Sequence, residues 1–149
     1  MRRPLALLVL VPLLLAACGD DDGDVVDTGG TGGDTPVVTY ADLDGRTFAS
    51  TGSTGYEIVE GTTITLAFAD ERVSANAGCN TLNGGVEVTE GRLETTSPLA
   101  ATMMSCEEPL MAQDQWLSGF LEAGPDIVLD GDALTLTAGD EVLELSAEP

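Results

Sequence analysis

Residues 62–68 have the sequence Thr-Thr-Ile-Thr-Leu-Ala-Phe, in which Ile64, Leu66 and Phe68 alternate with smaller or polar residues. Successive side chains of a β-strand point to opposite faces, so this alternation predicts a strand with one buried face. The same pattern recurs in shorter form at residues 86–88, 134–136 and 143–145. These repeated two-residue periods indicate a strand-rich domain whose sheet has one apolar face.

The C-terminal part of the chain predicts a three-strand antiparallel meander. Residues 127–129 (Ile-Val-Leu) form a continuous apolar run, which favours a strand buried on both faces. The pairs Asp130-Gly131 and Gly139-Asp140 mark tight turns on either side of Leu134-Thr135-Leu136. Residues 143–145 would then supply the third strand.

A single helix is predicted between the acidic pair Glu107-Glu108 and Gly124. Pro109 suits the first turn of a helix, and acidic residues are favourable beside its positive end. Gly124 followed by Pro125 is a strong stop signal. The apolar stripe of this helix consists of Leu110, Leu117 and Leu121.

Polar residues interrupt the apolar stripe of the helix, and aromatic residues lie beside it. Gln113 and Asp114 interrupt it, so the helix is expected to be only moderately amphipathic. Trp116 and Phe120 are neighbours four positions apart and are expected to pack in the core or at its rim. The expected fold for residues 40–149 is therefore strand-rich α+β. We predict a small antiparallel β-sheet or partly open β-barrel with one packed α-helix.

The N-terminus has the pattern of a bacterial lipoprotein signal peptide. Two arginines precede an apolar run that ends in Leu15-Ala16-Ala17-Cys18. The apolar run is shorter than the roughly 20 residues that a membrane-spanning helix needs, and it contains Pro12. We therefore expect residues 1–17 to be removed and Cys18 to receive the lipid, which would anchor the protein to a membrane on its extracytoplasmic side.

Residues 18–39 are predicted to be a disordered acidic tether. They are rich in glycine and aspartate and hold few large apolar side chains, so they cannot bury enough surface to offset the entropy of ordering. Asp20, Asp22 and Asp24 resemble the first ligands of an EF-hand loop. However, Val25 and Thr31 stand where that loop needs glycine and glutamate, so we predict no metal site.

The composition excludes several classes of function. The chain has 26 acidic residues, five basic residues and no histidine, for a net charge of −21, and all five basic residues are arginines. Nucleic-acid binding needs clustered cations, hydrolase triads and zinc motifs need histidine, and Schiff-base chemistry needs lysine. No carboxylate pair is set apart by an apolar environment. We therefore expect a protein without catalytic residues, cofactor or nucleic-acid partner.

Two cysteines remain if Cys18 carries lipid. Cys79 and Cys106 would then lie in an oxidising compartment, where a disulfide between them is the expected state. Two buried free thiols are the alternative. A redox-active pair is not expected, because the two residues are far apart in sequence and lack a Cys-x-x-Cys context.

The surroundings of these cysteines carry a family resemblance. The chain resembles the META domain, the family that includes the heat-shock protein HslJ, over about residues 40–147. The resemblance rests on these segments: Leu43–Phe48, Ala77-Gly78-Cys79-Asn80, Gly84-Gly85, Thr102-Met103-Met104-Ser105-Cys106, Pro109, Met111-Ala112-Gln113-Asp114 and Leu134–Leu136.

The family motif residues Gly78, Asn80, Thr102, Met104 and Pro109 are expected to have structural roles. Gly78 is suited to a positive φ, and the Asn80 side chain is suited to an Asx turn within its own loop. The hydroxyl of the neighbouring Ser105 and the acids after it are candidates to cap the helix.

We therefore expect a non-enzymatic, lipid-anchored cell-envelope protein, and the resemblance implies a role in envelope stress response or maintenance. One alternative is a binding module that captures or inhibits a basic envelope hydrolase, because an acidic domain attracts a basic partner. Another is a small barrel that holds an apolar ligand. The acidity itself also has a simpler explanation, since a highly charged surface keeps an exported protein soluble.

Overall fold

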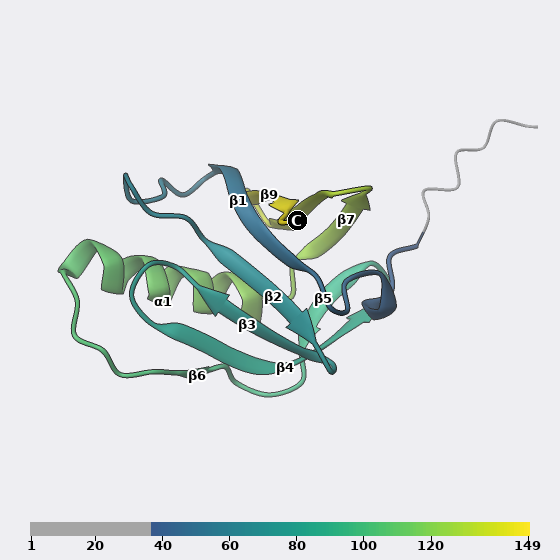
Figure 1. Ribbon diagram of the computed structural model, residues 1–149, viewed down its shortest axis with the longest axis horizontal. Helices are drawn as coiled ribbons and strands as arrows, with labels where there is room; N and C mark the ends of the chain where they lie inside the picture. The colour runs from purple at the N-terminus through teal and green to yellow at the C-terminus, as the bar shows by residue number, and fades with distance from the viewer. Residues whose placement is uncertain (1–36) are drawn as a thin grey trace, which may run out of the picture. The chain divides into compact units, whose positions relative to one another are not determined.

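In the computed structural model, which describes residues 37–149, nine antiparallel strands form one sheet that closes into a barrel (Figure 1). The elements in chain order are η1 (Tyr40–Asp42), β1 (Thr47–Thr54), β2 (Thr65–Ala69), β3 (Arg72–Asn76), β4 (Thr81–Thr89), β5 (Arg92–Thr95), β6 (Ala100–Ala101), α1 (Glu108–Glu122), β7 (Asp126–Asp130), β8 (Ala133–Ala138) and β9 (Glu141–Ala147).

Eight of these strands make the closed ring. Their order is β3-β2-β1-β9-β8-β7-β5-β4, and pairing of β3 with β4 closes it. β6 lies outside the ring, beside the first half of β4. The predicted strand-rich α+β class with one helix is confirmed, and the barrel closes completely instead of remaining partly open.

The local strand predictions are confirmed in most places. Ile64, Leu66 and Phe68 are all buried, as their alternation predicted. β7, β8 and β9 form the predicted meander, with antiparallel pairing between consecutive strands. Burial of residues 127–129 on both faces was wrong, because Ile127 is buried while Val128 is 50% exposed. A barrel strand has only one inward face, and Val128 lies on the outward one.

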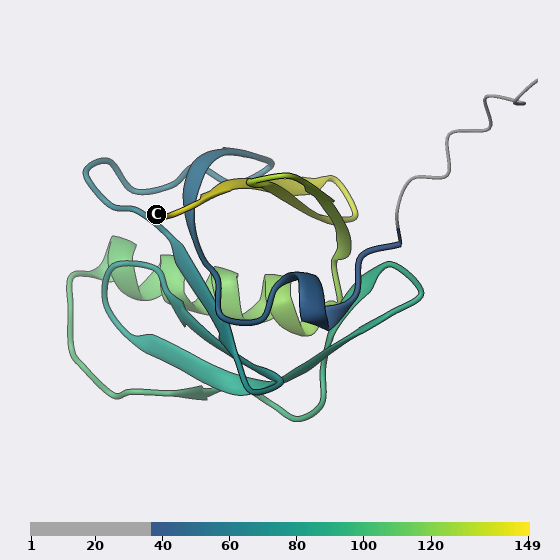
Figure 2. The same ribbon diagram turned by 45° about the vertical axis from the view of Figure 1, so that its right-hand side comes forward.

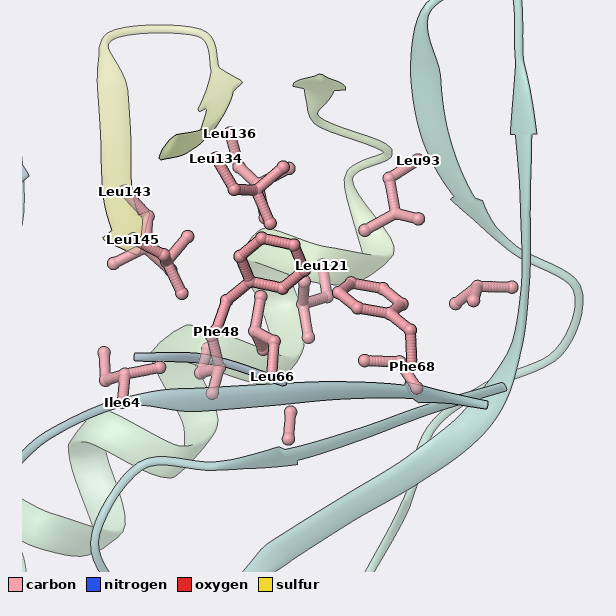
Figure 3. Packing of buried hydrophobic residues seen from close by; sticks show 14 of the residues in the cluster. Phe48, Ile64, Leu66, Phe68, Leu93, Leu121, Leu134, Leu136, Leu143 and Leu145 are labelled. Carbon is pink, nitrogen blue, oxygen red and sulfur yellow. The ribbon is translucent and has the colours of Figure 1, made fainter. Parts of the chain in front are cut away.

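Side chains fill the interior of the barrel (Figure 3). Phe48 and Phe68 meet edge to face with ring centroids 6.0 Å apart, and leucines of β8 and β9 pack against them. An eight-stranded barrel is about wide enough for its own side chains. The packed interior therefore gives no support to the alternative in which the barrel holds an apolar ligand.

Helix α1 lies across one end of the barrel, where it crosses beneath the meander (Figure 2). Leu117, Phe120 and Leu121 of its inner face join the core. The helix ends at Glu122 with Ala123 as its C-cap, and Gly124 follows with a φ of +67°, as the Gly-Pro stop predicted. Arg92 of β5 holds this end by donating from Nε to Gly124 O at 2.9 Å.

The side-chain cap predicted for α1 from Ser105 and the acids after it does not form. Glu107, one of those acids, occupies the N-cap position, but no side chain makes a capping hydrogen bond. Ser105 is exposed, in the segment that leads to the disulfide. Pro109 does lie in the first turn, as predicted, where its missing N–H costs nothing.

The described chain begins at the barrel end opposite to α1. Val38 is buried there, and it lines a shallow cleft with Arg46 and Leu129. The predicted signal peptide at residues 1–17, Cys18 and most of the 18–39 tether lie outside the described residues. Within residues 37–149, the helix is too short and too polar to cross a membrane.

Adjacent residues of β7 provide a test of the barrel register. We expect Ile127→Ala to lower the free energy of unfolding by about 2–5 kcal/mol, because it opens a cavity in the core. Val128→Ala should lower it by less than about 1 kcal/mol, because that side chain is half in solvent. Urea unfolding of the two variants measures both values, and equal losses would contradict the register.

Candidate binding groove beside the Gly-Cys-Asn loop

The loop between β3 and β4 is held in a conformation that requires glycine. Gly78 has a φ of +107°, as predicted, and a β-carbon at this position would lie 3.2 Å from Thr62 Cγ2. The Asx turn belongs to Asn76, whose Oδ1 accepts the N–H of Gly78 at 2.9 Å. The loop therefore turns sharply and presents Cys79 and Asn80 to the helix.

Asn80 joins three segments of the chain, so the prediction that it bonds within its own loop was wrong. Its Oδ1 accepts the N–H of Met104 at 2.7 Å and the hydroxyl of Thr102 at 2.9 Å. Its own N–H and its Nδ2 both donate to Asp114 Oδ2, at 2.8 and 2.9 Å. One buried amide thus fixes the loop, the segment after β6 and the helix relative to one another.

A disulfide lies beside these hydrogen bonds. Cys79 and Cys106 are bonded, with their Cα atoms 6.1 Å apart, which confirms the pairing predicted from the sequence. The bond closes a loop with a sequence separation of 27 residues. The chain-entropy model assigns about 3.5 kcal/mol of stabilisation to a loop of that size.

The two polar residues that interrupt the helix stripe are buried. Gln113 accepts the N–H of Val59 at 2.6 Å through Oε1, and its Nε2 donates to Ala77 O at 2.6 Å. Asp114 receives the two bonds from Asn80 through Oδ2. The polar part of this helix face therefore docks the helix onto the loops, while the apolar part fills the core.

Asp114 retains one unused acceptor. Its Oδ1 is fully buried and has no hydrogen-bond partner among the described residues. A buried acceptor without a partner is costly, by about 1–3 kcal/mol and more when it is charged. Asp114 is also the only buried carboxylate in residues 37–149.

Asp114 lines a groove of about 670 Å³ between α1 and β6, which we call the α1–β6 groove. Asn80 of the β3–β4 loop and Leu82 of β4 lie along it. Ala101 of β6 and Cys106 of the disulfide line it as well. The helix contributes Glu108, Met111, Ala112, Gln115 and Ser118. Figure 1 shows β6 as the outermost strand beyond β4 on this side of the molecule.

Of the five predicted motif residues, Asn80 lines this groove, and Gly78, Thr102 and Met104 belong to the segments next to it. Gly78 and Asn80 shape the loop, Thr102 accepts the N–H of Thr81 at 3.1 Å, and Met104 bonds to Asn80 through its backbone. The Met104 side chain takes no part in these backbone bonds and is 60% exposed. Pro109 stands apart in the first turn of α1.

A second cleft of about 620 Å³ lies beside Trp116. Trp116 stacks between Tyr56 and Phe120, with ring centroids 4.0 and 5.3 Å away, and its Nε1 donates to Glu141 at 3.0 Å. Burial raises the pKa of the Tyr56 phenol above its ordinary value. The polar atom of Trp116 is satisfied within the domain, which fits the predicted packing role of Trp116 and Phe120.

The remaining chemistry of the described residues is sparse. No group of three or more cysteine or acidic side chains in residues 37–149 is placed to hold a metal ion. The Asp114 carboxylate is surrounded by Asn80 and the groove, and no second carboxylate of this part of the chain is buried with it. The groove can therefore accept a ligand that carries hydrogen-bond donor groups.

The fold and the groove define a disulfide-bonded β-barrel closed at one end by a single helix. A family model described as the META domain matches residues 41–149, so the chain belongs to the META domain family. No curated protein matches the chain.

Two solved structures have the same fold. One, described as the NMR structure of a protein, is 24% identical, with a TM-score of 0.61 over 73% of this chain and 94% of that chain. The other, an NMR structure of a protein from Burkholderia xenovorans, is 17% identical, with a TM-score of 0.60 over 73% and 86%. At these identities the likeness shows the fold alone.

Sequence patterns did not identify Gln113 and Asp114 as site residues. They were recognised as breaks in the apolar stripe and as part of a segment that carries the family resemblance, but no role was predicted for them. A polar pair on the core-facing side of a helix is itself a signal that buried partners exist. The partners lie in loops that are 34 to 54 residues away in the chain. The open edge of β6 was also missed, because its two alanines carry no strand pattern.

Replacement of Asn80 tests whether its side chain organises the groove. We expect Asn80→Ala to lower the free energy of unfolding by about 2–4 kcal/mol, since Thr102, Met104 and the buried Asp114 lose a hydrogen-bond partner. Asn83→Ala, in β4, is the matched control and should change it by about 0.5 kcal/mol or less. Chemical denaturation measures both, and an Asn80→Ala variant as stable as the control would refute this role.

Proposed function

We propose that this META-domain protein is a non-enzymatic lipoprotein of the bacterial cell envelope, anchored through Cys18 and acting in envelope maintenance or stress tolerance. Its domain would work outside the cytoplasmic membrane as a binding module. The observation that carries the proposal is the pair of features at Cys18 and at Cys79–Cys106. The first is a lipidation pattern, and the second is a disulfide of the kind found in exported proteins.

The composition of the chain supports a binding role. Absence of lysine and histidine from the whole chain favours binding over catalysis. The stress role is implied by the resemblance of the motif segments to the family that includes HslJ.

Lipid attachment can be measured directly. We expect the protein produced in a bacterial host to incorporate radiolabelled palmitate and to fractionate with membranes. Cys18→Ala should abolish the label completely, while Cys79→Ala, which removes a different cysteine, should leave it in place. Label retained by Cys18→Ala, or absent from the unchanged protein, would overturn the anchor.

Capture of a basic envelope hydrolase is a second candidate function, and one observation favours it. The described residues contain twenty of the 26 acidic residues of the chain but a single salt bridge, between Arg46 and Asp132. Nearly all carboxylates of the domain therefore face solvent without a cationic partner. Such a surface attracts basic proteins and accelerates their association at low salt.

A basic c-type lysozyme is a suitable probe for this second candidate. We expect the purified protein to slow lysozyme digestion of peptidoglycan at least tenfold at 50 mM salt, with most of the effect lost at 500 mM salt, because screening weakens contacts between exposed charges. A peptidoglycan hydrolase of acidic pI serves as control and should be unaffected. Unchanged digestion of the substrate at low salt would eliminate this candidate.

A further inference from the structure

We propose that the α1–β6 groove binds an extended peptide segment with alternating apolar and basic side chains, which adds as a strand along the free edge of β6. The segment would belong to another envelope protein. This inference rests on the proposed function of the domain as a binding module and names its partner class. Three independent features of the groove point to it: an open strand edge, a set of exposed methionines and the unused oxygen of Asp114.

The first feature is the edge of β6, which is the open end of the strand order in the described residues. Thr102 donates its N–H to Thr81 O, so the alternation of an antiparallel pair turns the N–H and C=O of Ala101 away from β4. Ala101 also lines the groove. A peptide strand laid in the groove could therefore bond to Ala101, as in β-strand addition.

The contact of Leu99 shows which way this edge faces. Leu99 precedes Ala101 by two residues and so uses the same edge, and it donates its N–H to Glu122 of α1 at 3.0 Å. The free edge therefore faces the helix across the groove. At one end of this edge, Glu122 already accepts the N–H of Leu99. Further along the edge, the N–H and C=O of Ala101 remain available to a partner.

The second feature is the methionine content of this surface. Met111 lines the groove, and Met103 and Met104 lie in the segment between Ala101 and Cys106, two residues that line it. Met103, Met104 and Met111 are 99%, 60% and 47% exposed. Among the described residues they make up three of the five large hydrophobic side chains that are exposed. Methionine is flexible and polarisable, and exposed methionines are typical of surfaces that accept varied apolar side chains. An apolar side chain of the incoming strand would pack against them.

The third feature sets the charge of the partner. Asp114 is 94% buried and lines the groove with its Oδ1 unsatisfied, and Glu108 lines it as well. None of the three arginines of the domain lines the groove. A basic side chain of the peptide would be drawn to the site by the surrounding carboxylates. Protein atoms cover Oδ1 from solvent, so the basic group would supply the donor that Oδ1 lacks only after these atoms move aside.

A second copy of this chain fits the groove poorly. The domain carries twenty acids against three arginines, so two copies repel one another. Two of these three arginines already have partners within the domain: Arg46 pairs with Asp132, and Arg92 bonds to the end of α1. A basic, extended segment of a different protein is therefore the occupant that the charges favour.

The test uses fluorescein-labelled heptapeptides and the purified full chain in dodecyl maltoside, at 50 mM salt. The probe is Val-Lys-Val-Lys-Val-Lys-Val. We expect fluorescence polarisation to show binding of this probe. The version with glutamate in place of lysine should bind at least tenfold more weakly, and so should a version with N-methylated backbone amides, which cannot complete the strand pairing.

Two variants change the groove and leave the barrel intact. Ala101→Pro removes only the N–H that points away from β4, a position where an edge strand tolerates proline. The double variant Met103→Ser, Met104→Ser removes exposed apolar surface but none of the backbone bonds to Asn80. Each should weaken binding at least tenfold. Val128→Ser, an exposed change on β7, is the matched control and should stay within twofold.

The role of Asp114 is tested by Asp114→Asn, with Asp130→Asn as a control of equal charge change at the other end of the barrel. We expect at least tenfold weaker binding for the first and less than twofold for the second. Circular dichroism confirms that each variant is folded. In the unchanged protein, binding of the probe should also slow amide exchange at Ala101.

The outcomes separate this inference from the proposed function. Equal binding by all folded groove variants would show that the peptide is attracted by the surface charge alone. That result would overturn the groove as the binding site but leave the proposal that the domain is a binding module. A palmitate-labelled protein that binds no heptapeptide would overturn the groove and leave the anchor. Peptide binding that depends on Ala101 and Met104 in a protein without lipid would support the groove and overturn the anchor.

Discussion

The hydrogen bonds between Asn80 and Asp114 are the constraint on which the rest of the domain depends. A closed barrel has a filled interior, so its helix must attach to the rim, where loops rather than strands supply the contacts. Asn80 makes that attachment with two bonds to one carboxylate oxygen, and its own amide oxygen holds Thr102 and Met104. Asn80 thus couples the position of the helix to the course of the 102–106 segment.

The same interaction creates the groove. Because both Asn80 donors use Oδ2, the other oxygen of Asp114 is left buried without a partner. Because the amide oxygen of Asn80 anchors Met104 through its backbone, the methionine side chain is free to face outward. The features that fix the fold and the features of the proposed binding surface therefore occur in the same residues.

Much of the barrel could be predicted because its signals are local. The two-residue period of Ile64, Leu66 and Phe68 and the turns around β8 identify strands without knowledge of their partners. Val128 was misplaced because three consecutive apolar residues do not reveal how many faces of a strand are covered. The bonds of Asn80 were missed for a different reason: its partners lie 22 to 34 residues away, beyond any local pattern.

The disulfide connects the groove to the compartment in which the domain would act. β6 is held to β4 by only two residue pairs, and the residues after it are tied down by Asn80 and by the Cys79–Cys106 bond. Reduction would remove the covalent tie and leave a two-residue strand and hydrogen bonds through the side chains of Asn80, Thr102 and Glu122 to hold one wall of the groove. Loss of a covalent tie favours local opening of so short a strand. The disulfide therefore supports the shape of the groove where thiols are oxidised, which is the environment that a Cys18-anchored protein would occupy.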